Sequence, residues 1–172
     1  MKRKIIIALV LTLVLSIVTF IVSIYQKKRN DFVKYETMPK ISYTTIYNQK
    51  QNINNLTTYK GYVIQLFNPD CEICMGEAQD YFEHKDLLQD YLFFILSTDS
   101  IYKVKEFAVK QQLSQTDNFI FGHIDRTIMH SGFGDVPIPS LFLYNSERKF
   151  ITKTRITDSR TILKFFNEKK KH

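Results

Sequence analysis

Two cysteines separated by two residues, Cys71 and Cys74 in the sequence CEIC, limit the possible folds more than any other feature of the chain. They follow a short, mostly apolar run at residues 62–67 (YVIQLF), whose length and β-branched content predict a buried strand. Pro69 ends this strand, and Asp70 is a candidate N-cap for a helix that begins at the cysteines. A CxxC pair between a buried strand and a helix is a specific signal, whereas a CxxC pair without that setting occurs by chance.

This placement favours thiol–disulfide exchange over a structural role for the cysteines. The chain has no other cysteine, whereas a structural disulfide framework needs more of them. A closed zinc site needs four ligands, and no second Cys or His pair stands at ligand spacing. The first turn of a helix favours the thiolate, which is the nucleophile in disulfide exchange. Cys71 is therefore the candidate attacking thiol. Cys74, one turn further along the same face, is the candidate resolving thiol.

The order of the other elements predicts an α/β fold. Apolar or β-branched runs at 41–47, 92–97 and 118–124 predict further strands, and 48–55 is expected to be a loop. A helical period is expected over 100–113 and again over 159–167. Residues 141–144 and 149–156 flank a turn and predict an antiparallel hairpin. Together these elements predict a mixed sheet covered on both faces by helices.

A separate N-terminal segment predicts a membrane anchor. Residues 5–25 carry no charge and are long enough, as a helix, to cross a hydrocarbon core of roughly 30 Å. Lys and Arg flank the run on both sides. A cleaved signal peptide is the alternative, but its apolar region is shorter, about 7–15 residues. We expect an uncleaved anchor at 1–29, a tether at 30–40 and a compact domain at 41–172.

Most of the net positive charge of the chain lies in its first 40 residues. Residues 1–40 hold eight Lys or Arg and two acids, whereas residues 41–172 hold sixteen and fifteen. A nearly neutral domain has no basic surface for a phosphate backbone, so we expect no nucleic-acid binding. We expect a single-pass protein of the cytoplasmic membrane with its domain outside the cytoplasm, although the matched flanking cations do not themselves favour that orientation.

The cysteine segment and a later one carry a family resemblance. The stretch VIQLFNPDCEICMGE resembles the active-site strand and helix of thioredoxin-fold proteins, and VPIPSLFLYNSERKF resembles their cis-proline loop and last strands. The anchor and two acids, Glu72 and Glu77, more narrowly resemble the membrane-bound TlpA/ResA-type reductases. The resemblance implies a thiol–disulfide oxidoreductase without a cofactor or metal, acting on disulfide-bearing proteins and recharged by a membrane electron donor.

The resemblance also implies roles for particular residues. Glu77, three residues after the second cysteine, corresponds to an acid that assists proton transfer. Pro139 corresponds to the cis-proline, and with Ile138 it is expected to contact the substrate. The chain departs from thioredoxins in having no Trp, and in carrying Gln65 where many of them have a buried acid.

Two other functions remain open at this stage, together with the direction of electron flow. A copper-binding chaperone of the same fold is one alternative, but such proteins usually have three residues between the cysteines. A peroxiredoxin-like peroxidase is the other, although Asn68 occupies the position where peroxiredoxins have Thr or Ser. Asp70 and Glu72 place negative charge beside Cys71, which disfavours a thiolate there and predicts a reductant.

Overall fold

The structure is a computed structural model that describes residues 2–53 and 58–168. The chain divides into two units, residues 1–36 and residues 37–172. The expected domain at 41–172 lies within the second unit, in which Met38 and Ile41 are both buried. The last four residues of that expected domain lie outside the described residues, as does part of the expected loop at 48–55.

The first unit is the helix α1 (Lys2–Tyr35), which extends through the first half of the expected tether. Its described side chains at positions 11–26 are exposed and largely apolar, on all sides of the helix. Within the described residues, no helix is both long enough and apolar enough to cross a membrane.

The second unit contains, within the described residues, a seven-stranded mixed sheet. Its strands are β1 (Ser42–Thr45), β2 (Lys50–Asn52), β3 (Gly61–Leu66), β4 (Tyr91–Ser97), β5 (Phe119–His123), β6 (Ser140–Asn145) and β7 (Phe150–Thr154). The order across the sheet is β2-β1-β5-β4-β3-β6-β7. The strands β3, β4 and β5 are parallel, and the remaining neighbours are antiparallel. The predicted α/β class and mixed sheet are confirmed.

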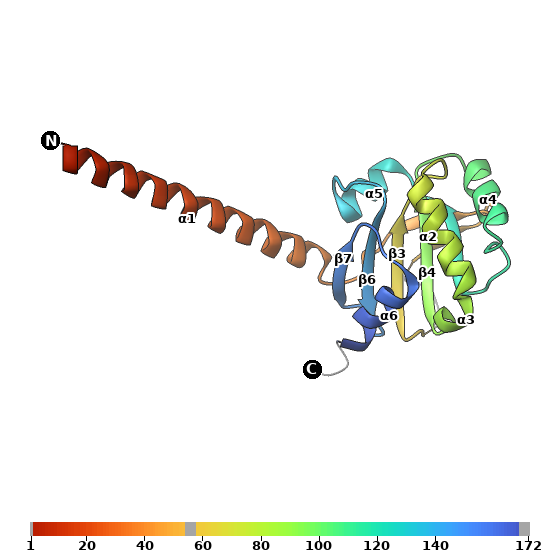
Figure 1. Cartoon of the computed structure of the whole chain (residues 1–172). Coiled ribbons are helices and arrows are strands. Elements are labelled where there is room, and N and C mark those ends of the chain that lie inside the picture. The colour runs from red at the N-terminus through yellow and green to blue at the C-terminus, as the bar shows by residue number, and fades with distance from the viewer. Residues whose placement is uncertain (1, 54–57, 169–172) are drawn as a thin grey trace. The chain divides into compact units, whose positions relative to one another are not determined.

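Helices cover both faces of this sheet (Figure 1). They are α2 (Glu72–Glu83), α3 (Lys85–Leu88), α4 (Ile101–Lys110), α5 (Arg126–Phe133) and α6 (Ser159–Glu168). The core beneath α2, α4 and α6 is aromatic: Tyr81 of α2 packs on Phe93 of β4, with ring centroids 5.2 Å apart. On the opposite face, Phe133 of α5 packs on Phe142 of β6 at 4.6 Å. Side chains alternate between faces along each strand, so successive buried residues fill both layers.

Gly61 has a specific part in closing the first layer. It lies at the start of β3, where the ring of Phe166 from α6 rests directly on the backbone. Any Cβ at position 61 would collide with that ring. Phe166 also stacks on Tyr91, with ring centroids 4.4 Å apart, so α6 packs against the first residues of both β3 and β4.

Two elements differ from the sequence-based expectation. The region expected to be a loop at 48–55 contains β2, which pairs with β1 as an antiparallel hairpin. Its sequence, KQN, lacks the apolar alternation of a half-buried strand because β2 is a partly exposed sheet edge. The helix α5 was not predicted, although Asp125 caps it by accepting a hydrogen bond from the Thr127 backbone at 2.7 Å.

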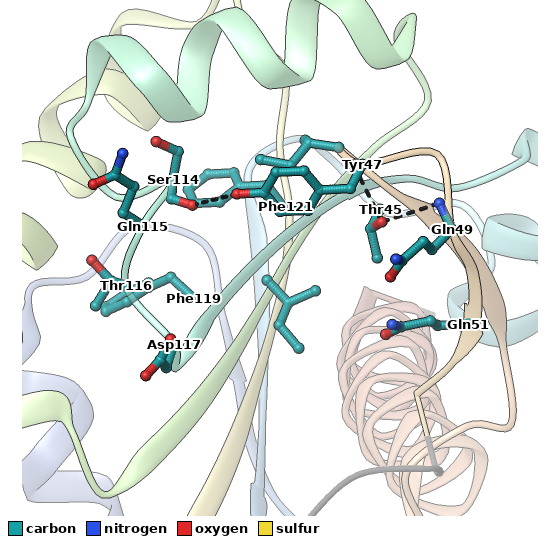
Figure 2. Close-up of a pocket in the computed structure, with 12 residues that line it drawn as sticks. Thr45, Tyr47, Gln49, Gln51, Ser114, Gln115, Thr116, Asp117, Phe119 and Phe121 are labelled. Carbon is teal, nitrogen blue, oxygen red and sulfur yellow. Dashed lines mark hydrogen bonds between the residues drawn. The ribbon is translucent and has the colours of Figure 1, made fainter.

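The β1–β2 hairpin and the loop that follows α4 enclose a pocket at one end of the sheet (Figure 2). The hydroxyl of Tyr47 spans it and donates to the Ser114 carbonyl oxygen at 3.0 Å. Thr45 closes the hairpin turn, because its Oγ1 accepts from the backbone nitrogens of Tyr47 and Gln49. Neither cysteine lines this pocket.

Candidate active site

The cysteines lie where β3 runs into α2, as the sequence predicts. Asn68 shapes the connection, since its side-chain oxygen accepts from the Asp70 backbone at 2.7 Å and its carbonyl accepts from the Cys71 backbone at 3.1 Å. The expected N-cap is one residue off. Cys71, not Asp70, caps α2, and its Sγ accepts a hydrogen bond from the Cys74 backbone nitrogen at 3.3 Å. The Asp70 side chain is instead drawn away by an ion pair.

The two thiols have different surroundings, and both are free. Cys71 is partly exposed at the helix N-terminus, whereas Cys74 is 1% exposed. Burial, followed by a side-chain hydrogen bond with Cys71, raises the pKa of the Cys74 thiol to about 12. Cys71 is thus the accessible thiol. Cys74 needs a nearby proton acceptor before it can act as a nucleophile.

Glu77 is a buried acid in the next turn of α2. It is 5% exposed, and burial raises its pKa from 4.5 to about 7. Two donors partly offset that effect: the Gln65 amide nitrogen lies 2.7 Å from Oε2, and the Thr157 backbone nitrogen lies 3.1 Å from Oε1. Glu77 lies three residues after Cys74 on α2, a spacing at which side chains are neighbours on a helix, and its charge contributes to the raised pKa of the Cys74 thiol. An acid that titrates near neutrality beside a buried thiol is suited to accept its proton.

The charges around Cys71 differ from the sequence-based picture. The carboxylate of Asp70 forms an ion pair with Lys103 of α4, at 2.7 Å. Lys103 thereby offsets one of the two negative charges expected beside Cys71. Glu72 remains exposed in the first turn of α2. The carboxyl groups that can disfavour a Cys71 thiolate are therefore those of Glu72 and Glu77, because Lys103 offsets the charge of Asp70.

The proline loop lies at the same end of the sheet as the cysteines. The peptide bond between Ile138 and Pro139 is cis, as the resemblance implied. Ser140 pairs with Leu66, so Pro139 precedes β6 where β3 leads into the cysteine segment. Pro139 itself is buried, whereas Ile138 is 37% exposed. An exposed apolar side chain at this position is available to a substrate, and the substrate-binding role of both residues stays a prediction.

The sequence did not identify three residues that contact Glu77 or Asp70 in the structure: Gln65, Thr157 and Lys103. The signal for Gln65 was its position, since it faces the same side of β3 as Val63 and therefore faces α2. Thr157 lies 80 residues after Glu77, and Lys103 lies 33 residues after Asp70. No local pattern marks such distant contacts. Within 2–53 and 58–168 no group of three or more metal-ligating side chains was found.

Comparison with known proteins identifies the fold. No known protein family and no curated protein is matched by the sequence. Among solved structures, the chain resembles a secreted disulfide oxidoreductase of Mycobacterium tuberculosis homologous to E. coli DsbE, with a TM-score of 0.62 and 16% identity over 75% of this chain and 96% of that one.

Two further structures extend the comparison. The thioredoxin domain of a thiol-disulfide oxidoreductase from Bacteroides vulgatus has a TM-score of 0.57 and 16% identity, over 80% of this chain and 95% of that one. A peroxiredoxin-like protein from Aquifex aeolicus has a TM-score of 0.62 and 13% identity, over 77% and 85%. The domain therefore has a thioredoxin-like fold, a mixed sheet flanked by helices. At these identities the likeness concerns the fold alone.

Proposed function

We propose that this protein is a thiol–disulfide oxidoreductase that reduces disulfides in proteins through Cys71 and Cys74. The observation that carries the proposal is the pairing of the two thiols. The partly exposed Cys71 caps α2, and the backbone N–H of Cys74, whose thiol is buried, donates to Cys71 Sγ at 3.3 Å. The occurrence of disulfide oxidoreductases among proteins of similar structure supports it.

The proposed reaction has two exchange steps. The Cys71 thiolate attacks one sulfur of a substrate disulfide, which forms a mixed disulfide and releases the other sulfur as a thiolate. Glu77 then takes the proton of Cys74, and the Cys74 thiolate attacks Cys71 Sγ. The Cys71–Cys74 disulfide forms and the substrate leaves fully reduced. Two electrons pass from the dithiol to the substrate, so a reductant must restore the dithiol afterwards.

We propose that electrons flow from this protein to its substrates. Glu72 and Glu77 place two carboxyl groups within six residues of Cys71. Negative charge near a thiol opposes the thiolate, and a less stabilised dithiol gives a more reducing couple. The ion pair of Asp70 with Lys103 weakens this effect without reversing it.

The proposal is tested by turnover of a protein disulfide. The full chain is expected to accelerate the reduction of insulin by dithiothreitol, because Cys71 is accessible while Cys74 is buried. The variant with both cysteines replaced by serine is the control and is expected to give only the uncatalysed rate. Copper titration of the reduced chain separates the alternative. Stoichiometric, tight binding of Cu(I) without insulin reduction would overturn the proposal in favour of a copper chaperone.

We further propose that α1 anchors the chain in the cytoplasmic membrane, with the thioredoxin-like domain on the extracytoplasmic side and a membrane protein as electron donor. The support is the charge-free run at 5–25 and the exposed apolar side chains of α1 at 11–26. A helix that is apolar on every side is suited to lipid rather than to water.

The anchor predicts how the protein fractionates. The full chain is expected to stay with membranes through high salt and carbonate, because burial of apolar area in lipid does not depend on charge. A chain that begins at residue 31 is expected in the supernatant. Release of the full chain by carbonate would contradict the anchor. Protease treatment of intact cells tests orientation separately, and a protected domain would place it in the cytoplasm.

A further inference from the structure

Gln65 of β3 contacts Glu77 of α2, the proposed proton acceptor. It lies on β3, is 2% exposed, and its amide nitrogen donates to Glu77 Oε2 at 2.7 Å. Its amide oxygen, Oε1, is also buried, and among the described residues it has no hydrogen-bond partner. An unpaired buried carbonyl costs roughly 1–3 kcal/mol, so its presence beside an acid that changes protonation calls for a physical account.

We propose that Gln65 is a positioning residue for Glu77 that holds the acid in both protonation states by turning its amide over. The inference rests on the proposed function, because the proton concerned is the one that Cys74 loses before it attacks the mixed disulfide.

The hydrogen bonds around Glu77 in the structure suit its ionised, carboxylate form. Both donors around Glu77 point at its oxygens, Gln65 Nε2 at Oε2 and the Thr157 backbone N–H at Oε1. A carboxylate only accepts hydrogen bonds, so this arrangement suits the anion. The anion has no use for Gln65 Oε1, and that oxygen is left unpaired.

The protonated acid needs the reverse arrangement at one oxygen. Once Oε2 carries a proton it must donate, and the Gln65 nitrogen cannot accept. A half-turn of the amide about its last side-chain bond exchanges Nε2 and Oε1, which have nearly the same size. Gln65 Oε1 then accepts from Glu77 Oε2–H, while Thr157 continues to donate to Oε1 of Glu77. The residue that binds the anion thereby also binds the acid.

We assign this positioning role to Gln65 rather than to the other described groups that face Glu77. On α2 they are Cys74, which supplies the proton, together with Asp80 and Tyr81. Asp80 accepts hydrogen bonds from Ser159 at the start of α6. Burial raises the pKa of Tyr81 well above its ordinary value, so this phenol stays neutral over the range in which Glu77 titrates. The turn before α6 contributes Thr157, whose backbone donates in either state.

The proton balance of the cycle follows from this pairing. Glu77 carboxylate receives the proton of the Cys74 thiol, and Gln65 turns as the acid forms. The Cys74 thiolate then attacks Cys71 Sγ, which forms the Cys71–Cys74 disulfide bond and breaks the bond between Cys71 Sγ and the substrate sulfur. The substrate leaves as a thiolate and takes up a proton from solvent, and Glu77 returns its proton to solvent as Gln65 turns back.

The first test uses the unaltered, reduced full chain and needs no catalysis. NMR follows the carboxyl carbon of Glu77 and the side-chain amide of Gln65 between pH 5 and 9. The proposal predicts that both titrate with one midpoint, near pH 7, because the amide reports the turn. A Gln65 amide that stays unchanged while Glu77 titrates would overturn the proposal.

Substitution provides the second test. Gln65→Met has the length of glutamine without its polar atoms, and removes a donor to the anion that is stronger than the acceptor for the neutral acid. The Glu77 midpoint is expected to rise by about one pH unit, a tenfold change in proton affinity. Gln111→Met, at another buried glutamine, is the matched control and is expected to leave it unchanged. An unmoved midpoint in Gln65→Met contradicts the pairing.

A further variant at the same position, Gln65→Glu, keeps the pairing testable if Gln65→Met does not fold. Gln65→Glu places two carboxyl groups at hydrogen-bond distance, so they are expected to share one proton and titrate in two separated steps. Two independent titrations would contradict the pairing. The pH dependence of mixed-disulfide resolution should follow the shifted midpoint in Gln65→Met. Titrations that move as expected in a chain without disulfide exchange would leave the pairing standing and overturn the proposed function.

Discussion

Replacing Cys74 with serine is expected to trap the protein in a covalent complex with its substrate, whereas replacing Cys71 is expected to trap none. Cys71 is partly exposed at the N-cap of α2, so it forms the mixed disulfide. Cys74 is 1% exposed and its backbone N–H donates to Cys71 Sγ, so it is shielded from the substrate but adjacent to Cys71, and its loss removes the resolving step. The expected difference is all or none, because no other cysteine in the chain can substitute for either thiol.

Non-reducing electrophoresis of the two single variants, mixed with oxidised insulin or isolated from cells, measures the trapped complex. The double serine variant is the control for non-covalent association. Labelling with a limiting amount of an alkylating reagent checks the same assignment without a substrate. Preferential labelling of Cys74 in the wild-type chain, or a complex trapped by Cys71→Ser, would reverse the roles of the two thiols.

Replacing Glu77 with glutamine is expected to slow resolution of the mixed disulfide by about 100-fold. The pKa of Cys74 is about 12 and that of Glu77 about 7, so the acid is the group beside the thiol that can take its proton near neutrality. In the wild-type chain the resolution rate is expected to rise with pH through about 7, as Glu77 loses its own proton. Glu83→Gln, at an exposed acid on the same helix, is the control and should behave as wild type. Single-turnover release of the substrate thiol measures the step.

The same substitution is expected to stabilise the fold at high pH. In the folded chain the pKa of Glu77 is raised from 4.5 to about 7, so between these values the folded state binds a proton that the unfolded state has lost. The free energy of unfolding therefore falls as the pH rises through this window. Above pH 7 the cost reaches about 3 kcal/mol, and Glu77→Gln removes it. Urea unfolding at pH 5 and pH 8 measures the effect, and a variant less stable than wild type at pH 8 would contradict the burial argument.

Much of the fold was predictable because its core strands are unusually apolar. The runs 62–67 and 92–97 each match a central strand, β3 and β4, to within a residue or two, because a strand buried on both faces leaves few polar positions. The strand β2 escaped prediction since an edge strand buries little and its KQN sequence resembles a loop. The helix α5 is eight residues long and follows β5 closely, which leaves too few positions for a period to be recognised.

The residues of the candidate site that are close in sequence could be predicted, whereas their contacts with distant parts of the chain could not. The spacing of Cys71, Cys74 and Glu77 places all three near one face of α2, which is a local property of a helix. The partners that decide how these groups behave come from elsewhere: Gln65 from β3, Lys103 from α4 and the Thr157 backbone from the turn before α6. Their contacts depend on how the helices pack on the sheet. The pairing of Asp70 with Lys103 shows the consequence, because it changes the charge beside Cys71.

The reduction potential of the Cys71–Cys74 couple shows directly whether this protein can reduce disulfides in its substrates. The full chain is equilibrated with defined ratios of reduced and oxidised dithiothreitol or glutathione, and the fraction of free thiol is read from the mass added by alkylation. We expect one two-electron couple, more reducing than about −200 mV. A potential near about −120 mV, typical of a strongly oxidising couple, would contradict the proposed direction. Failure of the two cysteines to form a reversible disulfide at any ratio would contradict the proposed function itself.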